Sequence, residues 1–175
     1  MKTVSLLRHA KSSWEEPEGA DIDRPLNDRG RKAAPQMGAY LAATEFAPDI
    51  VLCSSAKRTR QTLELIMPSL TRPKETRILD ALYEAMPGTL LAQVQALPDH
   101  MRHVLIVGHN PGLEMLAADL VGAAASDPHA LKLLKKKYPT GAFARFEFDA
   151  PAWKDIAPGM GRLVAFVRPN DLDKD

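Results

Sequence analysis

The strongest constraint on the fold of this chain is the way short apolar runs alternate with segments of helical spacing. Runs with the composition of β-strands occupy residues 3–7, 49–53, 75–79, 103–107, 143–148 and 163–167. Helix-like segments separate the first four runs. This alternation predicts an α/β domain in three layers, with a mostly parallel central sheet flanked by helices. The last two runs are joined by a segment rich in Pro and Gly, so we expect them to pair antiparallel at one edge.

Four segments place apolar side chains on one helical face. These side chains are Ala33, Met37, Tyr40 and Leu41; Leu63, Ile66, Met67 and Leu70; Leu90, Leu91, Val94 and Leu97; and Leu113, Leu116, Ala117, Leu120 and Val121. Asn110 and Pro111 predict the start of the fourth helix, because Asn is a favoured N-cap and Pro a favoured first helical residue.

Length and charge limit the function classes. A chain of 175 residues has the size of one domain, so we expect a single domain over residues 1–175. Its formal net charge of +1 lacks the basic excess typical of nucleic-acid binders. The first apolar run is broken at Arg8, which predicts neither a signal peptide nor a membrane span. Cys53, the single cysteine, lies in an apolar run and is interpreted as a buried hydrophobe in a cytoplasmic protein.

Reactive side chains follow each of the first four strand-like runs. They are Arg8 and His9; Ser54, Ser55 and Arg58; Glu84; and His109. Ligands of open parallel sheets bind outside the carboxyl ends of the strands. We therefore expect two histidines, two arginines and one carboxylate to meet at one edge of the sheet.

This set of residues suits an anion better than a metal ion. Two guanidinium groups would repel a divalent cation, whereas their planar forks match phosphoryl oxygens. A helix beginning near Ala56 would add the positive end of its dipole. No metal motif such as HExxH occurs, and no cofactor is expected. A neutral imidazole can attack phosphorus, but spacing alone does not decide whether His9 or His109 does so.

Four sequence elements resemble the histidine phosphatase superfamily, which includes phosphoglycerate mutases and SixA-type phosphohistidine phosphatases. The elements are LRHA at 7–10, DRPLNDRG at 23–30, SSAKRTRQT at 54–62 and VGHNPG at 107–112. Ala10 replaces the glycine of most members and is similar to the phosphohistidine branch. Asn27 stands where Thr is common, and Thr59 where Ala is usual. Together the four elements, in the family's order, make a strong signal.

The resemblance implies a phosphoglycerate mutase-like fold and a metal-independent phosphatase. In this reading His9 is the nucleophile, and Arg8, Arg58 and His109 bind the phosphoryl oxygens. Glu84 lies where many members keep a general acid. The phosphohistidine branch need not depend on such an acid, because a leaving imidazole with a pKa near neutrality takes a proton from solvent readily.

The expected substrate is a phosphorylated histidine on a partner protein, because the short chain has no obvious insertion to close over the site. A small phosphomonoester is the alternative substrate. A non-catalytic phosphate-binding module is a third interpretation, which the presence of both histidines and both arginines disfavours. A mutase is less expected, because it must exclude water.

Two further features remain open at the level of sequence. Trp14 follows the nucleophile in a polar loop and either flanks the site or anchors that loop. Four lysines, Lys132, Lys135, Lys136 and Lys137, form the solvated face of a helix or attract an acidic partner. His100, His103 and His129 match none of the four elements and are interpreted as surface or strand-end residues.

Overall fold

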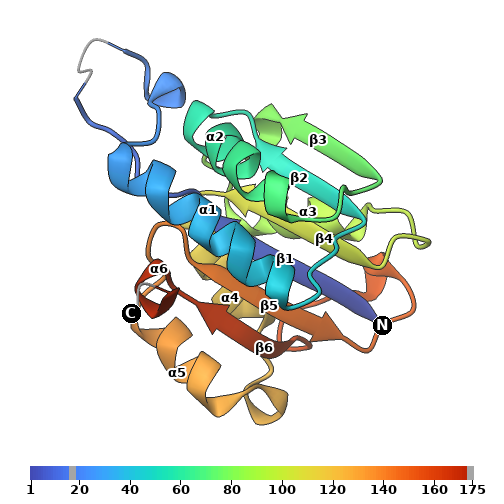
Figure 1. The fold of residues 1–175 in the computed structure, drawn as a ribbon. Coiled ribbons are helices and arrows are strands. Elements are labelled where there is room, and N and C mark those ends of the chain that lie inside the picture. The colour runs from blue at the N-terminus through green and yellow to red at the C-terminus, as the bar shows by residue number, and fades with distance from the viewer. Residues whose placement is uncertain (16–18, 173–175) are drawn as a thin grey trace.

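A six-stranded mixed sheet forms the centre of the molecule (Figure 1). The computed structural model describes residues 1–15 and 19–172. The strands are β1 (Lys2–Arg8), β2 (Ile50–Ser54), β3 (Glu75–Leu79), β4 (His103–Gly108), β5 (Phe143–Phe148) and β6 (Arg162–Val167). Their order across the sheet is β3-β2-β4-β1-β5-β6. All six expected strands are present, which confirms the predicted α/β class.

The sheet is parallel from β3 to β1 and antiparallel beyond it. β1 pairs in parallel with β4, β4 with β2, and β2 with β3. β5 runs back alongside β1, with Phe143 opposite Leu7, and β6 pairs antiparallel with β5 as predicted. The ends of β1, β2, β3, β4 and β6 and the start of β5 therefore share one edge of the sheet.

Helices cover both faces of the sheet (Figure 1). α1 (Asp28–Ala43) and α2 (Lys57–Ile66) pack on one face, together with the short α6 (Pro169–Leu172). α3 (Pro87–Gln95), α4 (Gly112–Leu120) and α5 (Pro128–Lys136) pack on the other face. The layers follow from the period of two along each strand, which sends successive side chains to opposite faces.

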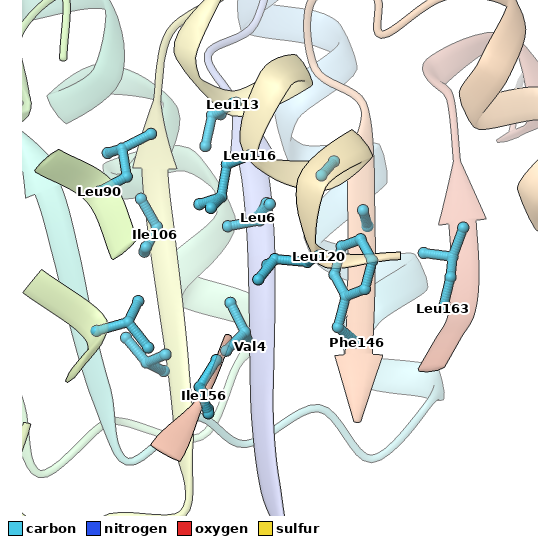
Figure 2. Packing of buried hydrophobic residues seen from close by; sticks show 14 of the residues in the cluster. Val4, Leu6, Leu90, Ile106, Leu113, Leu116, Leu120, Phe146, Ile156 and Leu163 are labelled. Carbon is cyan, nitrogen blue, oxygen red and sulfur yellow. The ribbon is translucent and has the colours of Figure 1, made fainter. Parts of the chain in front are cut away.

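Two apolar clusters fill the space between the layers. Leu6 and Ile106 point from β1 and β4 toward Leu113 and Leu116 of α4 (Figure 2). On the opposite face, Leu7, Val107 and Cys53 belong to the cluster that includes Met37 and Leu41 of α1. Cys53 is 0% exposed, and burial raises the pKa of its thiol to about 12. The interpretation of Cys53 as a buried hydrophobe is confirmed.

The predicted start of the fourth helix is wrong by one residue. The helix begins at Gly112, Pro111 occupies the N-cap position, and the Asn110–Pro111 peptide bond is cis. Asn110 still stabilises the first turn of the helix, because its Oδ1 accepts a hydrogen bond from the Glu114 N–H at 3.3 Å. In the part of the chain that the structure describes, no helix combines the length and apolar character needed to cross a membrane.

Candidate active site

A cavity of about 650 Å³ opens at the carboxyl edge of the sheet. Its lining includes Arg8, His9, Arg58, Glu84 and His109. The structure thus brings all five residues selected from the sequence to one place. They come from the ends of β1 and β4, the first turn of α2 and the loop after β3.

His9 is held by the backbone on both sides. Its N–H donates to the Gly108 carbonyl at 3.1 Å, and its own carbonyl accepts from the Gly141 N–H at 2.8 Å. The ring nitrogen Nδ1 lies 2.7 Å from the carbonyl oxygen of Ala10. A carbonyl can only accept, so Nδ1 carries the proton of the neutral ring and Nε2 keeps its lone pair.

Burial is the main reason that His9 stays neutral. It lowers the pKa of the ring to about 3, and the nearby His109, Arg8 and Arg58 add to the effect. The hydrogen bond to the Ala10 carbonyl opposes this lowering of the His9 pKa but does not cancel it. Near pH 7 the ring is therefore uncharged, as an attacking imidazole must be.

His109 lies beside His9, with ring centroids 5.4 Å apart. Its Nε2 lies 2.8 Å from Ser54 Oγ. The same oxygen accepts a hydrogen bond from the Ala56 N–H at 3.3 Å. With the hydroxyl proton directed to Nε2, the proton of His109 resides on Nδ1. This Nδ1 is buried and has no hydrogen-bond partner among the described residues. Burial, followed by Arg58, lowers the pKa of His109 to about 4.

The two arginines are fixed through part of their guanidinium groups. Arg8 Nη1 donates to the Tyr138 carbonyl at 3.0 Å. Arg58 donates through Nη1 to the Asp21 carbonyl at 2.8 Å and through Nη2 to Asp21 Oδ2 at 3.1 Å. Nε of each arginine is buried without a partner in residues 1–15 and 19–172. Each guanidinium is thus oriented while keeping donor capacity.

Asp21 is a site residue that the sequence reasoning missed. Its carboxylate accepts from Arg58, from Arg24 Nε at 2.9 Å and from the hydroxyl of Tyr83. The Tyr83 hydrogen bond is the main cause that lowers the Asp21 pKa to about 2. Burial, then the Asp21 bond, raises the pKa of Tyr83 to about 12. Asp21 lies in a 3₁₀ turn (Asp21–Asp23) just outside the matched element, where no periodicity reveals it.

Trp14 is part of the surface that lines the cavity. The residue is 77% exposed and lines the cavity, and the Arg24 guanidinium carbon lies 3.5 Å from the centroid of its ring. Arg24 also donates to Ser12 Oγ and to the Ser13 carbonyl, each at 3.0 Å. Trp14 therefore both flanks the cavity and helps anchor its loop.

Glu84 is exposed and lines the cavity, on a backbone with φ of 53°. This left-handed conformation is uncommon for a residue other than Gly and costs energy. The next residue, Ala85, packs tightly against α4, because a Cβ built at Gly112 would lie 2.0 Å from the Ala85 oxygen. Glycine at 112 thus lets the loop that carries Glu84 approach the helix after His109.

The described lining of the cavity is strongly cationic. Glu84 is its one carboxylate, against Arg8, Lys11, Arg24, Arg29, Arg58, Lys137 and Arg168. Within residues 1–15 and 19–172, no group of three His, Cys, Asp or Glu side chains could hold a metal ion. Guanidinium groups with fixed orientation and a neutral imidazole suit a phosphoryl group.

Comparisons with known proteins show the family of this chain. Residues 4–94 match the histidine phosphatase superfamily (branch 1). An uncharacterized protein of Mycobacterium tuberculosis is 38% identical over 93% of this chain and 99% of the relative. This protein belongs to the histidine phosphatase superfamily, branch 1.

Solved structures agree with this placement. A putative phosphohistidine phosphatase SixA from Nakamurella multipartitia superposes with a TM-score of 0.82 at 33% identity, covering 96% of each chain. A protein histidine phosphatase SixA complexed with tungstate gives a TM-score of 0.78 at 25% identity, covering 98% of this chain and 99% of that one. The phosphoglycerate mutase-like fold is thereby confirmed.

Proposed function

We propose that this protein is a metal-independent phosphatase that takes a phosphoryl group onto Nε2 of His9. One observation carries the proposal. A buried neutral His9, with its proton held on Nδ1 by the Ala10 carbonyl, shares a cavity with Arg8, Arg58 and His109. Nε2 is then the free nucleophile, and the cations can balance charge on the phosphoryl oxygens.

The reaction proceeds in two displacements at phosphorus. First, the Nε2 lone pair forms a bond to phosphorus while the bond to the leaving group breaks, and the leaving group takes a proton from solvent. Water then attacks phosphorus, the P–Nε2 bond breaks, inorganic phosphate departs and the proton of the water passes to solvent. Arg8, Arg58 and His109 Nδ1 supply donors to the equatorial oxygens in both steps.

Phosphohistidine on a partner protein is the proposed substrate. The likeness to SixA structures supports it, and one of those was solved with tungstate, a tetrahedral oxyanion like phosphate. The leaving imidazole needs little help with protonation, which agrees with an exposed Glu84. We propose the cytoplasm as the compartment, because a lone buried Cys53 suits reducing conditions.

A small phosphomonoester remains the second candidate. Glu84 lines the cavity and can serve as the acid that an alkoxide leaving group requires. The test compares purified protein on a phosphohistidine protein and on a panel of sugar and nucleotide monophosphates. We expect kcat/KM to favour phosphohistidine by at least about tenfold, or about 1.4 kcal/mol. A preference of that size for a monophosphate would overturn the proposed substrate.

A further inference from the structure

The exposed lysines of α5 and its end form a basic ridge beside the cavity, defined here as Lys132, Lys135, Lys136 and Lys137. α5 buries Ala130 and Leu133 in the core, which leaves all four lysines exposed. In the described parts of the chain, none of them forms an ion pair with a carboxylate. The ridge is thus an uncompensated positive surface on a chain whose net charge is only +1.

The ridge is continuous with the candidate active site. Lys137 lines the cavity, and so do Pro139 and Thr140, which follow it in the chain. The end of α5 approaches the edge of the sheet where α6 and the carboxyl end of β6 lie (Figure 1). Arg168, between β6 and α6, also lines the cavity. Positive charge therefore extends from the phosphoryl site out along α5.

Stabilisation of helix α5 explains only part of this clustering of lysines. Lys135 and Lys136 lie in the last turn, where cations complement the helix dipole. Lys132 lies a turn earlier, where that effect fades, and Lys137 is the C-cap residue and lines the cavity. Lys132, Lys135 and Lys136 do not line the cavity, so a small phosphomonoester bound there leaves them without a ligand.

We infer that the basic ridge is a docking surface for acidic side chains flanking the phosphohistidine of a partner protein. The inference rests on the proposed function and specifies the chemistry of its partner. Carboxylates on the substrate would pair with Lys132, Lys135 and Lys136 while the phosphohistidine enters the cavity. Such surface pairs act mainly on encounter and are weakened by salt.

The test uses two synthetic peptides phosphorylated on a central histidine, one flanked by Glu and the other by Gln. The substitutions Lys132→Glu, Lys135→Glu and Lys136→Glu are combined, because these residues lie outside the cavity. A control combines Arg72→Glu, Arg102→Glu and Lys154→Glu, which make the same charge change at exposed positions away from this edge. An aryl phosphate reports on the phosphoryl site alone.

At low salt we expect the unmodified protein to favour the Glu peptide by about tenfold in kcat/KM, with the preference falling as salt rises. The α5 variant should lose this preference and keep its rates on the Gln peptide and the aryl phosphate, while the control keeps the preference. Equal rates on both peptides, or an α5 variant that retains the preference, would overturn the docking surface. Hydrolysis of the aryl phosphate but of neither peptide would instead overturn the proposed substrate, and the docking surface with it.

Discussion

Arg58 is oriented by one residue, Asp21, through both its backbone carbonyl and its carboxylate. The Asp21 carbonyl accepts from Arg58 Nη1 and the Asp21 carboxylate from Arg58 Nη2, and the carboxylate also accepts from Arg24 and Tyr83. With a pKa of about 2, Asp21 is charged at any pH near neutrality. The acidic side chain thus positions the arginine without lying in the cavity lining, which makes it a positioning residue.

Asp21→Asn should lower kcat/KM by about tenfold, because it weakens charge-assisted hydrogen bonds worth about 1.5–3 kcal/mol. The inhibition constant of tungstate should rise with it, because both depend on the orientation of Arg58. Thermal melting checks that the fold persists. Asp23→Asn, at an exposed position in the same turn, is the control. Equal kinetics for the two variants would show that Asp21 does not position Arg58.

Glu84→Gln separates the two substrate classes through their leaving groups. The amide keeps the shape of the side chain but cannot donate the proton that an alkoxide needs. Hydrolysis of alkyl phosphates should fall by roughly 10²–10⁴, whereas phosphohistidine and acidic aryl phosphates should be spared. Steady-state rates on the three substrates provide the measurement. Equal losses of activity on all three substrates would show that Glu84 is not the general acid.

Helix α1 is seated directly against the loop that follows the nucleophile. Asn27 caps this helix by accepting from the Gly30 N–H at 2.9 Å, which explains why Asn can stand where Thr is common. A Cβ built at Gly30 would lie 2.1 Å from the Lys11 carbonyl oxygen. The glycine of the second matched element therefore permits a close approach of two backbones.

Gly30→Ala should push α1 away from the Lys11 backbone, destabilise the protein by about 1–3 kcal/mol and reduce kcat. Gly88→Ala in α3 meets open space and should be neutral or stabilising by up to about 1 kcal/mol. Chemical denaturation and steady-state rates of both variants test the contrast. A Gly30→Ala protein as stable and active as the parent would contradict the proposed contact.

The sequence predicted the presence of strands and helices better than the residues at which they begin or the contacts between distant side chains. Period and alternation predicted all six strands and the four helices from α1 to α4, because these signals come from burial. The start of α4 was misplaced, because Asn110 and Pro111 have the residue types of an N-cap and a first helical residue. In the structure Pro111 is the N-cap residue and the helix begins at Gly112. Asp21 escaped notice because its partners Arg58 and Tyr83 lie 37 and 62 residues away. Long-range pairing of this kind leaves no local pattern.

Three buried histidines make the stability of the whole molecule depend on pH. Burial lowers the pKa of His9 and His103 to about 3 and that of His109 to about 4. In the unfolded chain each pKa returns to about 6.5, so the unfolded state binds more protons between these values. The free energy of unfolding should therefore fall as pH drops below about 6.5.

His103 alone should contribute about 2 kcal/mol of this loss between pH 7 and pH 5. It lies outside the cavity lining and contacts Ser5 Oγ through Nε2 at 2.8 Å. His103→Gln removes the titrating ring, so its free energy of unfolding should fall less steeply over this range. Urea denaturation at several pH values measures the slope. The same slope in both proteins would rule out this contribution from His103.

The central claim is that the phosphoryl group passes through Nε2 of His9. The most direct measurement is a rapid quench into alkali with radiolabelled substrate, followed by peptide mapping, because phosphohistidine survives base and is labile in acid. We predict label on His9, and no label in a His9→Asn variant. Label on a Ser, Cys or Asp side chain or on His109, or full turnover by His9→Asn, would contradict the mechanism.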